Sequence, residues 1–412
     1  MSWGAERIVD LLHNAVRPYA WGSRTAIAEL LGKEVPAPHP EAELWMGAHP
    51  GDPSRVVGRD GTQHSLLDLL SADPDNQLGP RVAGRWGSRL PFLLKVLAAE
   101  EALSLQAHPS AAQAAEGFAA EEAAGVPRDA AVRNYKDPAA KPELVCALTE
   151  FHALAGFRAP DRTAALLRSL DAPALAPYTE MLVAQPDSSG LRALFTMLIT
   201  LPQTSLSVLL PQVLDACVLH VKEHGEFDLE CRTILELGES YPGDAGVLAA
   251  MLLNRIVLQP GEAIHLPAGN LHAYLRGTGI EILANSDNVL RCGLTPKHVD
   301  VPELLRVLDF ACDDMPVSTG EEVAPGVRVY RTPAPEFELS RLDVTDETLI
   351  DHDGPQIMIC TDGAAVLSNA RGEELHLTRG QSVWLPASDP AVLVRPDGVE
   401  SAQLFRATAG TD

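Results

Sequence analysis

Short apolar runs alternate with turn-forming residues over the first third of the chain. Apolar residues gather in runs of strand length, bounded by Pro and Gly, at 54–58, 91–99 and 143–149. Runs of this length between turn residues are typical of β-strands. The Ala-rich stretch 110–125 has helical composition and ends at Gly125, so it predicts one helix among these strands.

The pattern then becomes helical. Between 156 and 254, apolar residues recur at three- and four-residue spacing, which predicts several amphipathic helices in succession. Strand-like runs return at 255, and a short helix is predicted over 298–310. From 313 to the end the pattern again indicates strands and turns. A helical insertion therefore divides a chain that otherwise reads as β-structure.

One β-unit occurs twice. Residues 258–275 align without gaps to residues 377–394, and the two copies share a glycine, a leucine and a Pro-Ala pair. Where the first copy has His272, the second has Ala391. We interpret the shared residues as one structural element used twice, with an imidazole in the first copy alone. The second copy is therefore expected to bind no metal.

Composition limits the number of domains and the kinds of partner. A chain of 412 residues is too long for one ordinary core, so two or three domains are expected. The formal net charge of −24 argues against nucleic acid or an anionic membrane as the main partner. A small anion could still bind where Lys and Arg cluster locally.

The cysteines and the amino terminus favour a cytoplasmic protein. The six cysteines form no C-x-x-C pair and most lie in apolar surroundings, which is typical of buried thiols in a reducing compartment. The amino terminus carries Glu6 and Asp10 and no long apolar run, so no signal peptide is expected. No run approaches the roughly 18 apolar residues of a membrane span.

Two polar residues separated by two positions follow an apolar run. Gln106 and His108 are two positions apart, so in an extended chain their side chains point to the same face. Burying both without partners would cost several kcal/mol. They are therefore solvated, hydrogen-bonded to each other or bound to a ligand.

The first copy of the repeat suggests what that ligand is. It reads G-x5-P-x-G-x2-H and ends at His272. This resembles a conserved motif of the cupin superfamily of small β-barrels, in which the His projects into the barrel and binds a divalent metal. Glu143, which starts another strand-like run, is a further candidate. Gln106, His108, Glu143 and His272 together offer two nitrogens and two oxygens, a set that suits Zn²⁺ with one open position.

The coincidence of several segments strengthens this interpretation, because each residue alone is more often solvated or hydrogen-bonded. The chain resembles the type I mannose-6-phosphate isomerase (phosphomannose isomerase) family from its first to its last segment. The matching stretches are RPYAWGS (17–23), AELWMGAHP (42–50), LPFLLKVLAAEEALSLQAHPS (90–110), YKDPAAKPEL (135–144), HLPAGNLHAYLRGTGIEI (265–282) and NSDNVLRCGLTPKHVD (285–300).

The resemblance implies a fold, a cofactor and a reaction. It implies a metal-bearing cupin domain, a helical insertion and a C-terminal cupin-like domain. It implies one zinc ion per chain, with other divalent ions as alternatives, held by Gln106, His108, Glu143 and His272. The reaction interconverts mannose 6-phosphate and fructose 6-phosphate through an enediol, and the metal is implied to stabilise the developing enediolate.

The matching stretches also concentrate positive charge around one site. The implied substrate-binding residues are Trp21, Lys95, Ser104 and Lys297, with Ser104 and Lys95 as candidates for the phosphate. Arg291 resembles the family's catalytic arginine, whose guanidinium stays protonated and stabilises an oxyanion. A salt bridge between Arg291 and Asp287 is the alternative, and both can hold together.

The sequence leaves several candidates for the catalytic base. The family commonly carries Asn-His before the Lys-Pro-Glu sequence, and this chain has Ala139 and Ala140 there. A mechanism that assigns proton transfer to that His cannot operate here. The base is sought among Lys141, Glu281 and Asp287. We prefer Lys141 or Glu281, although a useful base needs a shifted pKa, which a sequence does not display.

Two other classes of function compete. The segment HVKEH, from His220 to His224, has the H-x-x-E-H order of inverted zinc proteases, while a solvated helix end is the simpler interpretation. A non-enzymatic cupin that binds a sugar or stores metal is the third option, and it needs neither Arg291 nor a basic cluster. Core packing is the expectation for Trp45 and Trp86.

These inferences define the expected architecture and partners. The fold class is mainly β with an α-helical insertion. Residues 1–155 and 255–312 form the catalytic cupin domain, 156–254 the helical domain, and 313–412 a C-terminal cupin-like domain without metal. The expected partner is a small sugar phosphate, without nucleic acid or membrane, and a monomer is expected.

Overall fold

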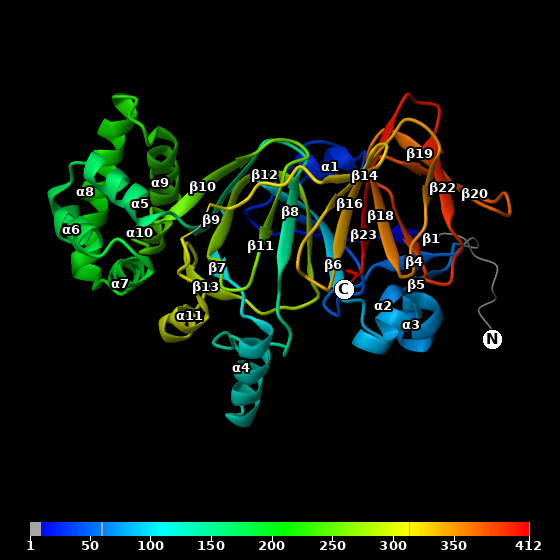
Figure 1. The fold of residues 1–412 in the computed structure, drawn as a ribbon, viewed down its shortest axis with the longest axis horizontal. Coiled ribbons are helices and arrows are strands. Elements are labelled where there is room, and N and C mark those ends of the chain that lie inside the picture. The colour runs from blue at the N-terminus through cyan, green and yellow to red at the C-terminus, as the bar shows by residue number, and fades with distance from the viewer. Residues whose placement is uncertain (1–9, 59–60, 313, 412) are drawn as a thin grey trace.

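The computed structural model describes residues 10–58, 61–312 and 314–411. A group of helices at one end of the molecule is followed by a central β-structure and then by a second β-structure at the other end (Figure 1). This confirms the predicted fold class, mainly β with a helical insertion. Residues 1–9, which carry most of the segment weighed as a signal peptide, lie outside the described residues.

The central β-structure is one ten-stranded sheet. Its strands are β2 (Ala15–Arg17), β3 (Glu43–Met46), β6 (Phe92–Ala99), β7 (Leu105–Ala107), β8 (Glu143–Ala147), β9 (Phe151–Phe157), β10 (Leu253–Leu258), β11 (Ala263–Leu266), β12 (His272–Ala284) and β13 (Leu290–Gly293). The long strand β12 pairs with β6 and β8 over its second half and with β9 and β7 near its start. Strand β12 thereby connects every segment that carries a predicted metal ligand.

The second β-structure contains two sheets. The larger one includes β1 (Asp10–His13), β4 (Arg55–Val57), β5 (Gln63–Ser65), β14 (Glu321–Ala324), β15 (Val327–Tyr330), β16 (Glu338–Val344), β18 (Gln356–Asp362), β21 (Ser382–Leu385) and β23 (Ala402–Thr408). The smaller one consists of β17 (Thr348–Ile350), β19 (Ala364–Asn369), β20 (Glu374–Thr378) and β22 (Val392–Pro396). An apolar core lies between the two sheets.

The amino-terminal strands pair within the carboxyl-terminal β-structure. Strand β1 pairs with β21, and β4 and β5 extend the same sheet. The start of the chain thus contributes to the carboxyl-terminal β-structure. The physical reason is that strands pair through backbone groups, so a short apolar strand does not specify its partner by local sequence.

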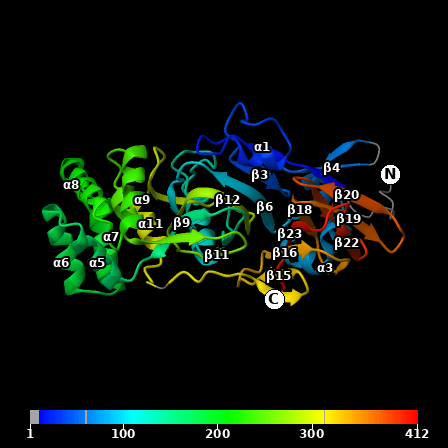
Figure 2. The same ribbon diagram turned by 90° about the horizontal axis from the view of Figure 1, so that it is seen from above.

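The two β-structures share a core. One face of β3, β6 and β12 carries apolar residues at alternate positions, such as Leu94, Val96 and Ile282. These pack in one cluster with Trp384 and Phe405 of the second β-structure. Both views place β6 between β12 and that structure (Figures 1 and 2). One face of the central sheet is therefore fully used for packing, which leaves the other face for chemistry.

The predicted helical insertion forms a group of helices whose core continues into the adjoining strands of the central sheet and α11. It comprises α5 (Pro160–Ser169), η1 (Pro173–Leu175), α6 (Ala176–Ala184), α7 (Ser188–Ile199), α8 (Gln203–Lys222), α9 (Asp228–Ser240) and α10 (Gly246–Ala250). Helix α8 is long and apolar enough to cross a membrane by length and composition alone. In the structure, its apolar stripe packs into the helical core through residues such as Leu206, Leu210 and Val213.

The remaining helices flank the β-structures. They are α1 (Ala26–Leu30), α2 (Leu66–Ala72), α3 (Pro74–Trp86), α4 (Ala111–Ala123) and α11 (Val301–Val307). Helix α4 confirms the helix predicted over 110–125, and the Ser110 and Gln113 side chains form a capping box at its start. Asp300 caps α11, the helix predicted over 298–310, by accepting a hydrogen bond from the Glu303 amide.

The predicted repeat is visible in the backbone. Strands β11 and β21 occupy equivalent positions in the two aligned segments. Gly261 and Gly380, which match in the alignment, have φ angles of 86° and 85°. A left-handed backbone favours glycine, which explains why both copies keep it. The cysteine prediction is also confirmed: five of the six are buried and none forms a disulfide.

Candidate metal centre and active site

The register of the central sheet brings polar residues onto its second face. Trp45, Lys95 and Glu281 lie directly opposite one another on β3, β6 and β12. Glu143 on β8 and Leu283 on β12 form the next row. Because side chains alternate between faces, residues two positions apart on these strands share the face that does not pack against the second β-structure.

A His–Glu–His cluster lies at the edge of this face. The Nε2 atom of His108 is 3.2 Å from Oε1 of Glu143, and the Nε2 atom of His272 is 3.4 Å from Oε2 of the same carboxylate. Their ligand atoms all lie within 4.8 Å of one another, and all three side chains are buried. Among the described residues, this is the one group of His, Cys, Asp or Glu so arranged.

Main-chain carbonyls orient both imidazoles. The Nδ1 atom of His108 lies 2.7 Å from the carbonyl oxygen of Asn288, and Nδ1 of His272 lies 3.0 Å from that of Asn270. A carbonyl only accepts, so both Nδ1 atoms carry the proton and both Nε2 atoms present lone pairs toward Glu143. Neither Nε2 atom has a hydrogen-bond partner, although both are buried. Such orphaned lone pairs suit a cation.

Electrostatics keep these groups in the form that binds metal. Burial lowers the pKa of His108 to about 4, so its imidazole is neutral near pH 7. Burial alone raises the pKa of Glu143, but His108 and Lys141 outweigh it and hold that pKa well below its ordinary value. A neutral His108 imidazole, the imidazole of His272 and one carboxylate fit zinc.

Gln106 is the fourth donor expected from the sequence. It lies on β7 opposite His272 on β12, and on the other side of β7 it pairs with Arg291 on β13. Strand β7 ends at Ala107, so His108 lies just beyond it rather than within it. Gln106 lines the cavity described next, and His108 contacts Glu143, which lines the same cavity.

A cavity of about 510 Å³ opens in front of the cluster. Its lining includes ten of the twelve residues proposed from the sequence, namely Trp21, Lys95, Ser104, Gln106, Lys141, Glu143, Glu281, Asp287, Arg291 and Lys297. The other two, His108 and His272, are buried beside it with Glu143. The structure thus brings all twelve residues to one place.

An ion-paired row crosses the floor of the cavity. Nζ of Lys95 lies 3.0 Å from Oε2 of Glu281 and 3.4 Å from Oε1 of Glu43. Burial lowers the pKa of Lys95, but these two carboxylates outweigh it and raise the pKa above its ordinary value. Burial raises the pKa of Glu281, and the nearby carboxylates of Glu143 and Glu43 add to that effect against the opposing charge of Lys95.

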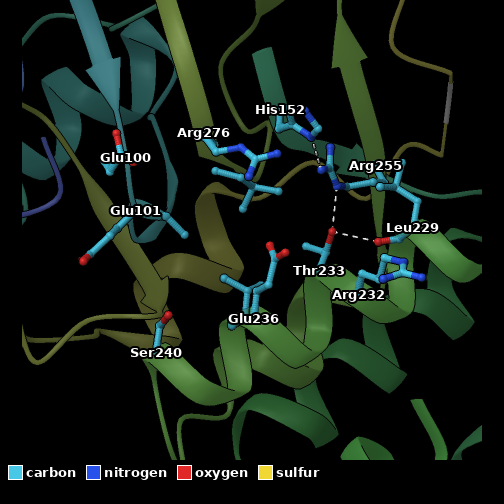
Figure 3. A pocket seen from close by; sticks show the side chains of 13 residues that line it. Glu100, Glu101, His152, Leu229, Arg232, Thr233, Glu236, Ser240, Arg255 and Arg276 are labelled. Atoms are coloured by element: carbon cyan, nitrogen blue, oxygen red, sulfur yellow. Dashed lines mark hydrogen bonds between the residues drawn. The ribbon is translucent and has the colours of Figure 1, made fainter. Parts of the chain in front are cut away.

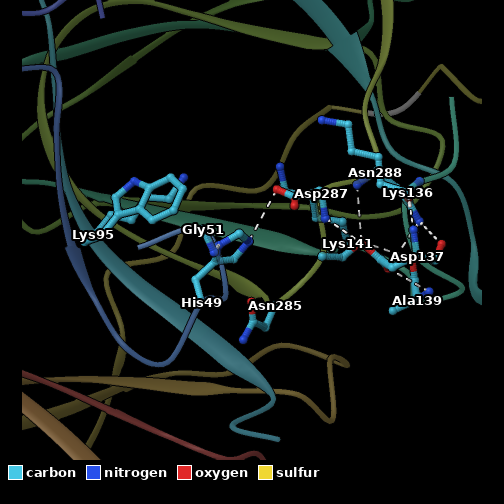
Figure 4. Close-up of polar contacts among 12 residues, drawn as sticks. His49, Gly51, Lys95, Lys136, Asp137, Ala139, Lys141, Asn285, Asp287 and Asn288 are labelled. Carbon is cyan, nitrogen blue, oxygen red and sulfur yellow. Dashed lines mark hydrogen bonds and ion pairs between the residues drawn. The ribbon is translucent and has the colours of Figure 1, made fainter. Parts of the chain in front are cut away.

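Asp287 pairs with an imidazole rather than with Arg291. Nε2 of His49 lies 3.3 Å from Oδ1 of Asp287, while Nδ1 of His49 accepts a hydrogen bond from the Gly51 amide (Figure 4). The contact with His49 lowers the pKa of Asp287. Arg291 forms no ion pair with any described residue, so the salt bridge weighed as its alternative role is absent there. Burial lowers the pKa of its guanidinium.

The loop that carries Ala139 and Ala140 is held by Asn288. The buried Asn288 amide group accepts from the Lys136 amide at 2.8 Å and donates to the carbonyls of Asp137 and Ala139 at 2.7 and 2.9 Å (Figure 4). The carbonyl of the same Asn288 orients His108. One residue therefore links this loop to the metal cluster.

Sequence reasoning missed several residues of the cavity. Glu43, His49 and Tyr274 line it but were not proposed, and Trp45, expected only in the core, donates from its indole to Glu43 at 2.7 Å. The spacing that joined Gln106 to His108 also joins Glu43 to Trp45 and His272 to Tyr274. The two-residue spacing could therefore have identified Glu43 and Tyr274 as residues on the same face as the proposed site.

The HVKEH segment forms no metal site among the described residues. His220 lies in the last turn of α8, and its Nε2 accepts a hydrogen bond from the Phe227 amide at 3.3 Å. His224 has a positive φ of 54° just past the end of the helix. His220 therefore closes the end of the helix, in line with the simpler interpretation.

Comparison with known proteins agrees with this geometry. Residues 9–160 match the family model described as phosphomannose isomerase type I, catalytic domain. The chain is 41% identical to mannose-6-phosphate isomerase from Escherichia coli over 394 residues, which cover 94% of this chain and 97% of the relative.

Solved structures extend the similarity to the fold. A zinc-bound mannose 6-phosphate isomerase superposes with a TM-score of 0.89 and 38% identity, covering 98% of this chain and all of that one (100%). A mutant of phosphomannose isomerase from Salmonella typhimurium gives the same TM-score at 37% identity and the same coverage. Since sequence and fold agree over almost the whole length, the chain belongs to the type I phosphomannose isomerase family.

Proposed function

We propose that the protein interconverts mannose 6-phosphate and fructose 6-phosphate at the cavity between Lys95, Glu281 and the His108–Glu143–His272 cluster. The observation that carries this proposal is the pair of orphaned Nε2 atoms facing one buried carboxylate, beside a cavity lined by Arg291, Lys141 and Lys297. Relatives named mannose-6-phosphate isomerase match over nearly their whole length, and one solved relative is zinc-bound.

The donor set assigns the cofactor to particular residues. Zinc would be held by His108, Glu143, His272 and Gln106, beside the cavity that would receive the sugar. When bound, zinc supplies a Lewis acid that favours negative charge on the sugar oxygens at C1 and C2.

Other residues of the cavity bind the phosphate and stabilise the negative charge that develops on the sugar. Lys297 and Ser104 line the cavity and bind the phosphate, where a charged hydrogen bond is strong. Arg291 has no carboxylate partner among the described residues, so its guanidinium is available to an oxyanion of the substrate.

Glu281 takes the proton from C2 and returns it to C1. Its carboxylate is only 3% exposed, and burial raises its pKa toward the operating pH, which suits proton transfer. Lys95, at 3.0 Å, holds it in place. Lys141 contacts Glu143 at 3.2 Å and is occupied there, and Asp287 has a lowered pKa, so both are less suited as bases.

Two wider proposals concern the compartment and the domain organisation, and the free, mostly buried cysteines support a reducing compartment. We propose that the chain acts as a cytoplasmic monomer. We also propose that the catalytic unit is formed by the central sheet, with the helical insertion between β9 and β10 and a carboxyl-terminal unit that binds no metal.

A coupled assay tests the proposed function. Zinc-loaded protein should convert mannose 6-phosphate to fructose 6-phosphate, and Glu281→Gln should lower kcat by roughly 10²- to 10⁴-fold, because loss of a general base costs about that much. Zinc content should stay unchanged in this variant. Absence of turnover by the zinc-loaded parent protein would reject the proposal.

A further inference from the structure

A second cavity, of about 350 Å³, lies where the helical insertion meets the central sheet. Its volume is in the range that binds small metabolites. It is lined by β9, β10 and β12 on one side and by α9 on the other (Figure 3). None of the residues proposed for the isomerase site lines it.

The sheet register gathers three basic side chains on one side of this cavity. His152 on β9 lies opposite Arg276 on β12 and opposite Val257 on β10. Arg255 is two residues before Val257, so its side chain shares the face of His152. The pairing of β12 with β9 is irregular between Tyr274 and Arg276, and such bulges re-aim side chains next to binding sites.

Arg255 is held only by neutral groups. Its guanidinium donates to the Thr233 hydroxyl at 2.8 Å and to Nδ1 of His152 at 2.5 Å (Figure 3). It also donates to the Ile256 carbonyl at 2.7 Å. Because His152 accepts at Nδ1, its proton is on Nε2, which faces Glu150 at 2.8 Å. Burial lowers the pKa of Arg255 to about 10. A half-buried guanidinium without a carboxylate partner is stabilised by an incoming anion.

Carboxylates lie near these arginines without forming ion pairs with them, and Glu236, Glu230 and Glu150 oppose the effect of burial on the pKa of Arg255. Figure 3 shows Glu100 and Glu101 on the opposite side from Arg255, and Glu236 projects from α9. In the described chain, neither Arg255 nor Arg276 forms an ion pair with any carboxylate. A ligand that carries both an anion and hydroxyl groups fits this arrangement, since hydroxyls donate to carboxylates.

We propose that this cavity is a second binding site, which takes a small hydroxylated phosphate monoester. The phosphate binds Arg255 and Arg276, where guanidinium groups contact phosphate oxygens in pairs, and the hydroxyls bind the carboxylate side. Arg232 lies at the edge and is already paired with Asp228 at 2.8 Å, so it contributes less.

The proposed site lies directly behind the wall of the isomerase cavity. Ala102 lines both cavities, and its carbonyl accepts a hydrogen bond from Tyr241 at 2.7 Å. The amides of Glu100 and Glu101 donate to the Trp21 carbonyl at 3.0 and 3.2 Å. A ligand against Glu100 and Glu101 therefore contacts the segment that holds Trp21.

Isothermal titration calorimetry with glycerol 3-phosphate tests this site without any turnover, so the outcome does not depend on the proposed reaction. The titration uses protein carrying Ser104→Ala and Lys297→Gln, which removes the proposed phosphate contacts of the isomerase cavity. On this background we expect saturable binding. Adding Arg276→Gln should weaken it about tenfold or more, as expected for loss of one charged hydrogen-bond donor.

The control is Arg168→Gln, an exposed arginine of α5 that contacts only Glu180 and does not line the cavity. It should leave the affinity unchanged. Arg276 is exposed, so the Arg276→Gln variant should fold. Arg255→Gln should also weaken binding, and the thermal midpoint of this variant is measured to check that it is folded. The proposal is overturned if the background protein shows no saturable binding, or if Arg276→Gln and Arg168→Gln bind equally well.

Discussion

At the scale of single residues, hydrogen bonds with neighbouring groups orient the proposed metal ligands. Main-chain carbonyls fix His108 and His272 in the tautomer that leaves Nε2 free, and both lone pairs face Glu143. Arg291 lies in the same cavity without a carboxylate partner among the described residues. The site therefore combines a place for a cation with a free guanidinium, as stabilisation of an enediolate requires.

This arrangement predicts a kinetic signature for Arg291. Arg291→Ala should lower kcat by about 10²-fold or more, because one donor to a transition-state oxyanion is worth that much. KM should change far less, and zinc content should stay near one per chain, since no proposed ligand is removed. Arg291→Lys should restore only part of the loss, because an ammonium keeps the charge without the planar fork. A steep rise in KM with kcat intact would instead assign Arg291 to the phosphate.

At the scale of elements, loops far apart in sequence position the ligands that the strands carry. Asn288, just before β13, holds the 136–139 loop through its side chain and His108 through its carbonyl. Strand β12 carries His272 at its start and Glu281 nine residues later, so a single strand joins the metal cluster to the proposed base.

Loss of the Asn288 side chain should therefore weaken metal binding. In Asn288→Ala, the amide of Lys136 and the carbonyls of Asp137 and Ala139 lose their partners, and the segment that orients His108 loosens. We expect zinc affinity to fall about 10- to 100-fold, as for other residues that support a ligand. A competitive chelator titration measures this. Asn76→Ala, whose side chain bonds only Asp73 on the far side of the protein, should leave affinity unchanged; equal affinity in both variants would contradict the account.

Much of this site was predictable from the sequence, and the missing parts have a physical reason. Spacing in the chain and the family resemblance indicated twelve residues, which the structure brings together around one cavity. His49 was missed because its partner Asp287 is distant in sequence, and no local pattern connects them. Trp45 is expected in the core as a large aromatic residue, and it is buried there with Leu93 and Leu283, but no local pattern shows that it also lines the cavity.

At the scale of the whole molecule, the catalytic sheet depends on the rest of the chain. Its apolar face packs in one cluster with Trp384 and Phe405 of the second β-structure, and β1, from the start of the chain, pairs there with β21. The sequence predicted the helical insertion and the repeat, because periodicity is local. It did not predict that β1, β4 and β5 join the carboxyl-terminal sheet, because strand pairing over long separations leaves no local signal.

The shared core predicts a large effect of a distant substitution. Trp384 is fully buried and donates from its indole to Gln77 at 2.9 Å. Trp384→Ala should lower the free energy of unfolding by about 3–5 kcal/mol, as expected for removal of a buried aromatic side chain. Leu349→Ala, at a position 62% exposed, should change it by no more than about 0.5 kcal/mol. Urea denaturation compares the two, and equal stabilities would show that the shared core contributes little.

The central claim is that isomerase activity depends on one zinc ion held by His108, Glu143, His272 and Gln106. The most direct measurement is isomerase activity during chelation and zinc titration, with metal content determined on the same protein. We predict that activity disappears on chelation and returns linearly with zinc up to one equivalent per chain. His272→Ala should contain almost no zinc, whereas His220→Ala combined with His224→Ala should match the parent protein. Full activity after complete metal removal, or stoichiometric zinc in His272→Ala, would contradict the account.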